Sequence, residues 1–564
     1  MRFPRFDQVV VGLAGALILG GAAPVAAQRI GGAQARAIDR VFDRFAGTAT
    51  PGCAVGVYRG RSIAYARGYG MGNLELGVPI GTASTFQLAS VSKQFTAMAL
   101  VLLEQDGALR LDDDIQRYLP EVPTFGRSVT IRQMINHTSG IRDGLTPLVL
   151  GGLQYPGESI RLLDALSAVT RQERLEFEPG TDYSYSNATY WLMGIIVQRV
   201  TGHSLTEFTT DRIFKPLGMH RTRFHGDPAS LLPGRTHAYS LRGSDSTYRL
   251  DIPFYESVGA GGLYSSVDDL VHWHRNFVDG TVGGAAGIRA METRGVLASG
   301  DTLAYALGIA RGSYRGAVTW SHSGSDGGYR TYLVRLPEHD LGVAVLCNAN
   351  HAAPTLLAEQ VVDIVLGAAL PARADSIVPA GAASTAAELA EHAGYYRNER
   401  DLYRFAVHEG ALRFGLTPPG RPLRALGGNR YQLGADSLGL FTFRQRDGRW
   451  VVERPHPYIA GRIMELAASP AGAPTADQLA AYAGEYWSED VGAAATVSVK
   501  EGRLVIRHHR GDEVPLRPSI ADGFVPVGSG SGRYQFQRHG DSWSVVGFVI
   551  DTDRAHGIRF VRRR

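Results

Sequence analysis

The chain has 564 residues, of which 44% are hydrophobic and 20% charged. This length exceeds what one hydrophobic core usually organises, so we expect two or three domains. Its 58 basic residues nearly balance 54 acidic ones and form no dense cluster, so nucleic acid is not an expected partner.

The first residues are typical of an export signal. Arg2 and Arg5 precede an apolar run, Val9 to Gly21, and small residues fill positions 22–27. The run is shorter than the roughly 20 residues that a membrane-spanning helix needs. We therefore expect a signal peptide over 1–27, a periplasmic or secreted mature protein and no stable membrane span; a membrane anchor is the alternative.

The two cysteines, Cys53 and Cys347, each lie in an apolar run with the character of a β-strand. They are either two buried thiols or one disulfide, which forms only if the two strands are neighbours. The sequence leaves both alternatives open.

Residues 28–370 have the pattern of a layered α/β unit. A short amphipathic helix over 33–47 precedes strand-like runs at Cys53–Tyr58 and Ser62–Tyr69. Helical patterns fill most of 90–202, and strand patterns return between Val318 and Leu346. Strands at both ends with helices between them predict one α/β domain.

An S-x-x-K pattern, Ser90 to Lys93, follows the loop Gly81–Leu88 and opens a predicted helix. The partial positive charge of a helix N-terminus favours negative charge that develops there. Residues three apart share a helical face, so the Lys93 amine can reach the Ser90 hydroxyl and take its proton if it is partly desolvated. Alone, the same pattern also fits an ordinary capped, solvated helix.

The wider segment Phe86–Thr96 resembles the nucleophile segment of the serine β-lactamase and DD-peptidase superfamily. Three further strings resemble elements of that family in the same order: His137–Gly140, Tyr185–Asn187 and His322–Gly324. The resemblance covers about residues 35–367. It implies an antiparallel sheet flanked by helices, with a helical subdomain.

The resemblance also implies roles for the residues of these strings. Ser90 is the expected nucleophile, and Lys93 and Tyr185 are its expected partners in proton transfer. Asn187 is expected to bind substrate or to steady Lys93; an asparagine that merely serves the turn after Pro179-Gly180 is the alternative.

The third string has the form H-x-G where many β-lactamases carry K-T-G. It is more similar to that of the D-aminopeptidase, DD-carboxypeptidase and esterase members. His322 is expected to polarise or bind near the acyl carbonyl, or else to serve the structure as a strand cap. Gly324 and Ser325 belong to the expected substrate site, and the backbone N–H groups of Ser90 and Ser325 are the expected oxyanion hole.

Other sequence patterns are weaker evidence for a functional site. His272 and His274 do not share a helical face at a spacing of two, so we expect no metal site and no cofactor. No G-x-S-x-G is present, which disfavours an α/β-hydrolase elbow. His508 and His509 are expected to be a surface pair.

A repeat follows the α/β unit. The string Leu389–Tyr396 recurs ninety positions later as Leu479–Tyr486, and each copy continues in short alternating runs. We expect a linker over 371–386 and two small antiparallel β-barrel modules over 387–470 and 475–564, with few contacts across the boundary. The loop Gly528–Gly532 is expected to lean over the Ser90 cleft; modules that act only as spacers, and a chance repeat, are the alternatives.

Together these patterns predict a serine hydrolase that forms a covalent acyl-enzyme. It is expected to cleave an amide or ester bond of D-amino-acid-containing peptides or related esters, with a small molecule or short peptide as its partner. A low-turnover binding protein on the same fold and a β-lactamase are the alternatives. The oligomeric state is not encoded in any pattern we can name.

Overall fold

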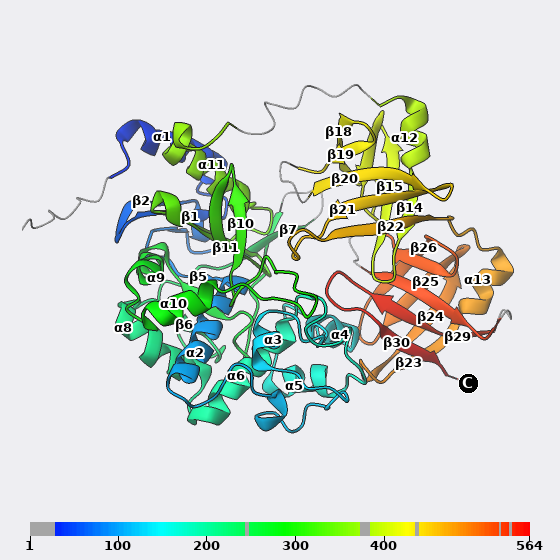
Figure 1. Cartoon of the computed structure of the whole chain (residues 1–564), viewed down its shortest axis with the longest axis horizontal. Helices are drawn as coiled ribbons and strands as arrows, with labels where there is room; N and C mark the ends of the chain where they lie inside the picture. The colour runs from blue at the N-terminus through cyan, green and yellow to red at the C-terminus, as the bar shows by residue number, and fades with distance from the viewer. Residues whose placement is uncertain are drawn as a thin grey trace, which may run out of the picture.

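The computed structural model describes residues 29–242, 247–372, 384–434, 439–528, 532–540 and 544–563. An α/β domain is followed by two β-rich modules that stand beside it (Figure 1), which confirms the predicted fold class. The predicted signal peptide and most of the predicted linker lie outside the described residues. In the described part of the chain, no helix has both the length and the apolar character needed to cross a bilayer.

An antiparallel six-stranded sheet forms the centre of the α/β domain. Its strands, in spatial order, are β10 (Ala310–Tyr314), β11 (Ala317–Asp326), β12 (Tyr329–Leu336), β13 (Leu341–Cys347), β1 (Cys53–Arg59) and β2 (Ser62–Tyr69). The strands from the two ends of the domain thus meet in the middle of the sheet, where β1 pairs with β13.

Cys53 and Cys347 are register partners on these two strands and form a disulfide. The two alternatives that the sequence left open are therefore decided in favour of the disulfide. It joins residues that are 294 positions apart in the sequence.

Both faces of the central sheet are covered by helices, which explains why its middle strands are continuous apolar runs (Figure 1). Alternate residues of a strand face opposite sides. On β1, Ala54 and Tyr58 pack with one helical layer, whereas Val55 and Val57 pack with the other.

The smaller layer consists of α1 (Gly32–Val41) and α11 (Pro354–Leu366). The predicted first helix is shorter than 33–47, because α1 ends at Val41 and a separate 3₁₀ turn, Asp43–Phe45, follows.

The larger layer contains the helical subdomain. Its helices are α2 (Lys93–Gln105), α3 (Ile131–Ile135), α4 (Leu145–Leu150), α5 (Leu162–Thr170), α6 (Asn187–Thr201), α7 (Leu205–Thr209), α8 (Lys215–Leu217), α9 (Val267–Asp279) and α10 (Gly284–Glu292). The domain also contains three small sheets of short strands. They are β3 (Met71–Asn73) with β4 (Val78–Pro79), β5 (Phe86–Gln87) with β9 (Leu263–Ser265) and β6 (Arg223–Phe224), and β7 (Tyr239–Arg242) with β8 (Thr247–Leu250).

The first module is a nine-stranded antiparallel sheet over an aromatic core, entered through α12 (Ala386–His392). Its strands are β14 (Gly394–Arg397), β15 (Leu402–His408), β16 (Ala411–Phe414), β17 (Arg421–Pro422), β18 (Arg424–Gly427), β19 (Arg430–Gln432), β20 (Leu440–Arg446), β21 (Arg449–Pro455) and β22 (Ile463–Ser469). Strands β17 and β18 are the two ends of its hydrogen-bonded order.

The second module is a closed eight-stranded barrel, entered through α13 (Ala476–Tyr482). Its strands are β23 (Gly484–Ser488), β24 (Ala493–Lys500), β25 (Arg503–His508), β26 (Glu513–Pro518), β27 (Gly523–Pro526), β28 (Arg533–Arg538), β29 (Val545–Asp551) and β30 (Ile558–Arg562). The entry helices of both modules begin with a threonine capping box, at Thr385 and Thr475, which reflects the repeat in the sequence.

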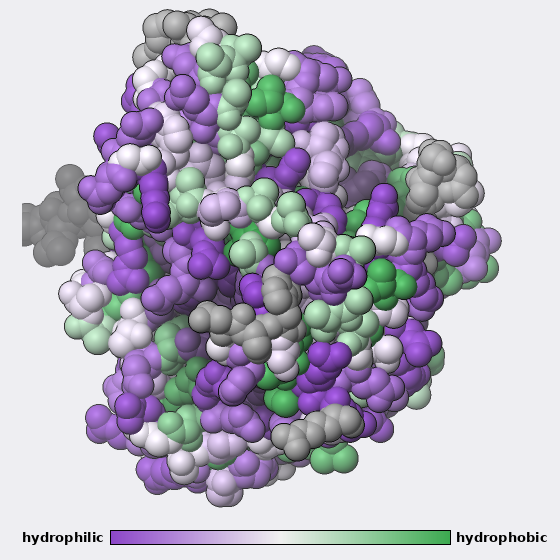
Figure 2. All heavy atoms as spheres, turned by 90° about the vertical axis from the view of Figure 1, so that its right-hand side faces the viewer, coloured by the Kyte–Doolittle hydropathy of each residue, from purple (hydrophilic) through white to green (hydrophobic). Residues whose placement is uncertain are grey.

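Both modules fold back onto the α/β domain, contrary to the expectation that few contacts cross the boundary. Leu303 and Ile459 form a β-bridge to the first module, and Arg142 pairs with Asp490 of the second at 3.2 Å. Composition near Leu370 marks the linker, but it carries no information about where later segments dock. The face shown in Figure 2 is mainly hydrophilic, with apolar residues scattered over it.

Candidate active site

The expected nucleophile Ser90 lies in a tight turn between β5 and α2. The turn is a 3₁₀ segment, Ala89–Ser92, that runs directly into α2 at Lys93. Ala89 has a φ of 50°, a conformation that costs a non-glycine residue free energy and persists only when its surroundings enforce it. Here Gln87 enforces it, because its Oε1 accepts a 2.7 Å hydrogen bond from the Ala89 N–H.

Strand β11 packs against this turn at Gly324. A Cβ at this position would lie 2.3 Å from the Leu88 carbonyl oxygen and 2.2 Å from Thr331 Oγ1. Only glycine therefore allows the third string to approach the nucleophile turn this closely. Along β11, His322 and Gly324 are buried, whereas Ser325 is exposed in the cleft that also contains Ser90.

Lys93 is fully buried beneath Ser90, with its Nζ 3.1 Å from Ser90 Oγ. Two acceptors hold the amine, Asn187 Oδ1 and the Ala260 carbonyl oxygen, each at 2.8 Å. Burial, helped by the positive charge of Arg554, holds the pKa of Lys93 well below its usual range. A neutral amine that donates its two N–H groups to these acceptors presents its lone pair to Ser90.

Asn187 is the first residue of α6 and is itself fixed. Its backbone N–H donates to Asp143 Oδ1 at 2.7 Å, and its side chain accepts from Lys93. This contact corresponds to one of the two roles expected of Asn187, that of steadying the lysine.

Tyr185 lies beside Lys93, with Lys93 Nζ 4.8 Å from the centre of its ring. Its hydroxyl is buried and completes no hydrogen bond of regular geometry with a described residue. Burial raises the pKa of Tyr185, and the neighbouring Ser90 hydroxyl opposes this only in part. Tyr185 therefore keeps its proton near neutral pH and is available as a donor.

His322 has both ring nitrogens occupied. Nδ1 lies 2.7 Å from the Ser323 carbonyl oxygen, an acceptor only, so Nδ1 carries the proton. Nε2 then accepts from the Tyr305 hydroxyl at 2.9 Å. Burial and the proximity of Lys93 lower the pKa of His322 to about 3, so the third string carries no positive charge.

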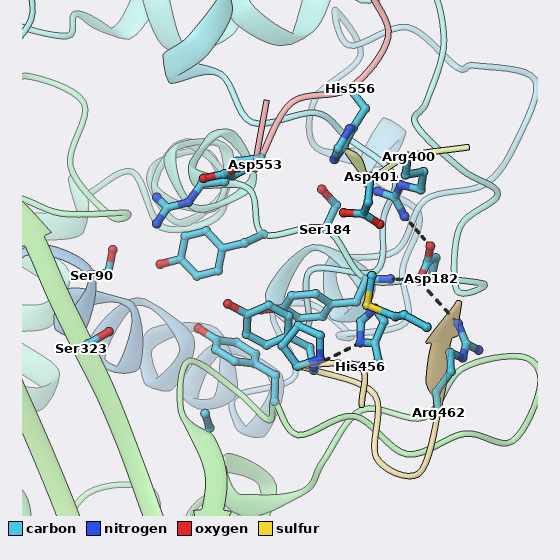
Figure 3. A pocket seen from close by; sticks show the side chains of 18 of the residues that line it. Ser90, Asp182, Ser184, Ser323, Arg400, Asp401, His456, Arg462, Asp553 and His556 are labelled. Carbon is cyan, nitrogen blue, oxygen red and sulfur yellow. Dashed lines mark hydrogen bonds and ion pairs between the residues drawn. The ribbon is translucent and has the colours of Figure 1, made fainter. Parts of the chain in front are cut away.

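A cavity of about 930 Å³ opens above Ser90 and is shared by all three parts of the chain. Ser90 and Ser323 lie at one side of it, and Asp182, Arg400, His456 and Arg462 lie at the other (Figure 3). The second module contributes Asp553, Arg554 and His556. The expected site residues Ser90, Tyr185, His322 and Ser325 line this one cavity, with Lys93 in contact with Ser90 beneath it.

Comparison with known proteins agrees with this geometry. The Beta-lactamase family model matches residues 38–366. The chain belongs to this family. It is similar to a D-aminopeptidase of Gluconobacter oxydans, with 30% identity over 343 residues that cover 59% of this chain and 61% of that protein. A penicillin-binding protein of Bacillus subtilis is 29% identical over 306 residues, which cover 51% of this chain and 66% of that protein.

The chain thus aligns with less than two thirds of the length of these curated relatives. Among solved structures, the octameric penicillin-binding protein homologue from Pyrococcus abyssi superimposes with a TM-score of 0.55 at 21% identity. That match covers 85% of this chain and 99% of that one, and it supports the fold.

One buried carboxylate of this Beta-lactamase domain was missed by sequence reasoning. Asp326 accepts from Gln87 Nε2 at 2.7 Å and from the Tyr255 hydroxyl at 2.6 Å, and it also contacts the Tyr155 hydroxyl. Burial raises its pKa to about 7. The signal was present, since Asp326 follows His322 and Gly324 at a spacing of two and so shares their buried face of the strand.

Arg554 was also missed, and no local pattern marks it. It lies on the turn between β29 and β30, among other polar residues. The loop that sequence reasoning did favour, Gly528–Gly532, has residues 529–531 outside the described part of the chain.

The weaker histidine patterns have structural explanations. His274 is buried and His272 is half-buried, and no group of residues suited to hold a metal ion occurs in the described ranges. His509 is exposed as expected. The expectation is wrong for His508, which is half-buried because it stacks on Tyr534 and hydrogen-bonds to its hydroxyl at 3.3 Å.

Proposed function

We propose that this protein is a serine hydrolase that forms an acyl-enzyme at Ser90 and cleaves amide or ester bonds, in D-amino-acid-containing peptides or related esters. The observation that carries the proposal is the buried Lys93 amine, 3.1 Å from the Ser90 hydroxyl and held by two acceptors, with burial keeping its pKa well below the usual range. Such an amine is a general base already in position.

The proton path follows from the protonation states of the two partners. As Ser90 Oγ forms a bond to the substrate carbonyl carbon, its proton passes to Lys93. Tyr185, which is still protonated, gives its proton to the departing nitrogen or oxygen as that bond breaks. Lys93 then returns a proton to Tyr185, so acylation leaves both groups as they began, and water hydrolyses the ester at Ser90.

The substrate class is supported by two observations. Relatives similar to this chain include D-aminopeptidases of two bacterial genera. His322 is neutral, so the third string carries no cation. This agrees with its H-x-G form, which is more similar to the form found in aminopeptidase, carboxypeptidase and esterase members than to that of β-lactamases.

Active-site labelling tests the proposal directly. A fluorophosphonate probe should label the full-length protein, and mass spectrometry should place the adduct on the peptide that contains Ser90. Ser90→Ala should abolish the label and the turnover of a D-alanyl ester while the fold is retained. Ser323→Ala, a change at a second cleft serine that has no adjacent lysine, should keep the label. A label that survives in Ser90→Ala would refute the assignment.

We also propose that the protein is exported and that the mature chain begins after residue 27. The disulfide between Cys53 and Cys347 supports this, because structural disulfides persist mainly in oxidising compartments. The intact mass of protein recovered from the periplasm or the culture medium should correspond to loss of residues 1–27; a full-length mass there would contradict the cleavage.

A further inference from the structure

The turn between β29 and β30 of the second module is clamped into the cleft. Arg142 Nε donates to the His556 carbonyl oxygen at 2.7 Å, and Glu176 Oε1 accepts from the His556 N–H at 2.7 Å. The Asp143 N–H donates to the Arg554 carbonyl oxygen at 3.4 Å. The side chains of Arg142 and Glu176 are only 1% and 0% exposed. Because buried side chains hold the turn, it is a fixed part of the cleft wall.

This turn places the Arg554 guanidinium in the cavity, 5.0 Å from the centre of the Tyr185 ring. Arg554 is exposed to the cavity, and no described residue forms an ion pair or hydrogen bond with its guanidinium. The preceding residue, Asp553, also lines the cavity, but no ion pair joins the two side chains.

The other cationic groups of the cavity wall are already paired or neutral. Arg400 pairs with Asp182 and with Glu176, and Arg462 pairs with Asp301 at 2.6 Å. His322 is neutral, with both nitrogens occupied. Of the cavity-lining cations that the structure describes, Arg554 alone is left to meet an anionic group beside Tyr185.

We propose that Arg554 binds a carboxylate on the leaving group of the substrate, and that this enzyme therefore prefers peptides that end in a free carboxylate at the scissile residue. The inference rests on the proposed function, because Tyr185 is the group that protonates the departing nitrogen. A residue that departs beside Tyr185 is also near Arg554, because the guanidinium is 5.0 Å from the centre of the Tyr185 ring. In a C-terminal amino acid, one carbon separates the departing nitrogen from the carboxylate. A guanidinium recognises a carboxylate through paired N–H···O bonds.

A matched pair of substrates tests the inference on the full-length protein: N-acetyl-D-alanyl-D-alanine and the same dipeptide with a C-terminal carboxamide. The wild type should have the higher kcat/KM for the acid. Arg554→Gln should lower kcat/KM for the acid by between about ten- and a hundredfold, the range typical of a hydrogen bond to a charged group. At a pH above the acidic limb of both proteins, kcat/KM for the carboxamide should change by no more than about threefold. Arg559→Gln, a change at an exposed arginine on β30 outside the cavity lining, should leave the acid-to-amide ratio unchanged.

A binding measurement separates this inference from the proposed function. In a Ser90→Ala background, calorimetry should show that the acid binds more tightly than the carboxamide, and that adding Arg554→Gln removes the difference. Equal affinity for both dipeptides, or equal losses for both in Arg554→Gln, would overturn the role of Arg554. Absence of turnover and of a label at Ser90 would instead overturn the proposed function, and the binding comparison would still decide on Arg554.

Discussion

At the scale of single residues, burial decides the chemistry of the cleft. Lys93, Tyr185 and His322 all lose most of their contact with water, and each is driven toward its neutral form. A neutral lysine accepts a proton, a neutral tyrosine donates one, and a neutral histidine does neither when both of its nitrogens are occupied. The same physical cause thus gives three residues three different roles.

Removing the base should slow acylation specifically. Lys93→Ala should lower the rate of fluorophosphonate labelling at Ser90 by about a hundredfold or more, because general base assistance typically contributes about 10²–10⁴. Lys215→Ala provides the matched control, since Lys215 is an exposed lysine that pairs with Asp211. A labelling rate within a few fold of wild type in Lys93→Ala would exclude Lys93 as the base.

The pH dependence should report the charge of Arg554. Acylation needs deprotonated Lys93, so kcat/KM for a neutral amide should fall as the pH drops through the pKa of Lys93. Arg554 lowers that pKa, so its removal in Arg554→Gln should shift the acidic limb to higher pH. Arg559→Gln should not shift it. An acidic limb that stays in place in Arg554→Gln would show that Arg554 does not act on Lys93.

Asp326 should make the stability of the folded protein depend on pH. Its pKa is about 7 in the folded protein and about 3.9 in an unfolded chain, so the folded state holds the proton more tightly. Its contribution to stability is therefore present below about pH 4 and is lost as the pH rises toward 7. The melting temperature of Asp326→Asn, relative to wild type, should rise between pH 4 and pH 7; a constant difference would show that Asp326 does not titrate in this window.

At the scale of elements, β11 and the nucleophile turn act as one unit. Strand alternation directs His322, Gly324 and Asp326 to the buried side, where Gly324 touches the turn and Asp326 reaches it through Gln87. The strained Ala89 is thus held from two directions. The position of the Ser90 hydroxyl therefore depends on how a strand packs against a turn that is more than 200 residues away in the sequence.

Gly324→Ala should disturb this fit without removing any catalytic group. The added methyl would collide with the Leu88 carbonyl and move the turn, and a displacement of about 1 Å at a reacting group typically costs about a hundredfold in rate. We expect a loss of that size in labelling rate. Gly81→Ala, where a Cβ meets nothing within 4 Å, is the control. Equal rates in the two variants would contradict the role of Gly324.

Most of this unit could be predicted from the sequence, but the contacts between the strand and the turn could not. The apolar runs that became β1 and β13 and the three ordered strings were visible because strands and motifs have local patterns. The 3₁₀ turn at Ala89 and the Gln87–Asp326 contact were not, since both depend on which strand lies against the turn. Arg142, Glu176 and Arg554 have the character of surface residues in the sequence, and only long-range packing places them in or beside the cleft.

At the scale of the whole molecule, the boundaries proposed from sequence, 28–370, 387–470 and 475–564, separate units that nevertheless share one cavity. The second module contributes the turn that carries Arg554, and the first contributes the loop with His456 and Tyr458. The modules are therefore walls of the cleft, which favours a role in selecting substrates over that of spacers.

Truncation after Leu370 tests this role. The truncated protein should keep the nucleophile unit and lose the parts of the cavity wall that both modules supply. The ratio of kcat/KM for a bulky ester to that for a small ester should therefore rise by about tenfold, a change of about 1.4 kcal/mol. Stability should fall, because Arg142 and Glu176 lose their partners Asp490 and His556. Circular dichroism must show that both proteins are folded. An unchanged ratio in folded proteins would mean that the modules do not shape the site.

The order of Ser90 and the clamped turn along the chain bears on biosynthesis. The wall residues Asp553 to His556 come far after Ser90 in the chain, so Ser90 is synthesised before them. A nascent chain that is still being translated can therefore hold the serine and the lysine long before it holds the third string or the turn. Because the cleft wall that carries Arg554 is complete only when β29 and β30 have formed, a nascent chain that has not yet reached them carries the nucleophile without this wall.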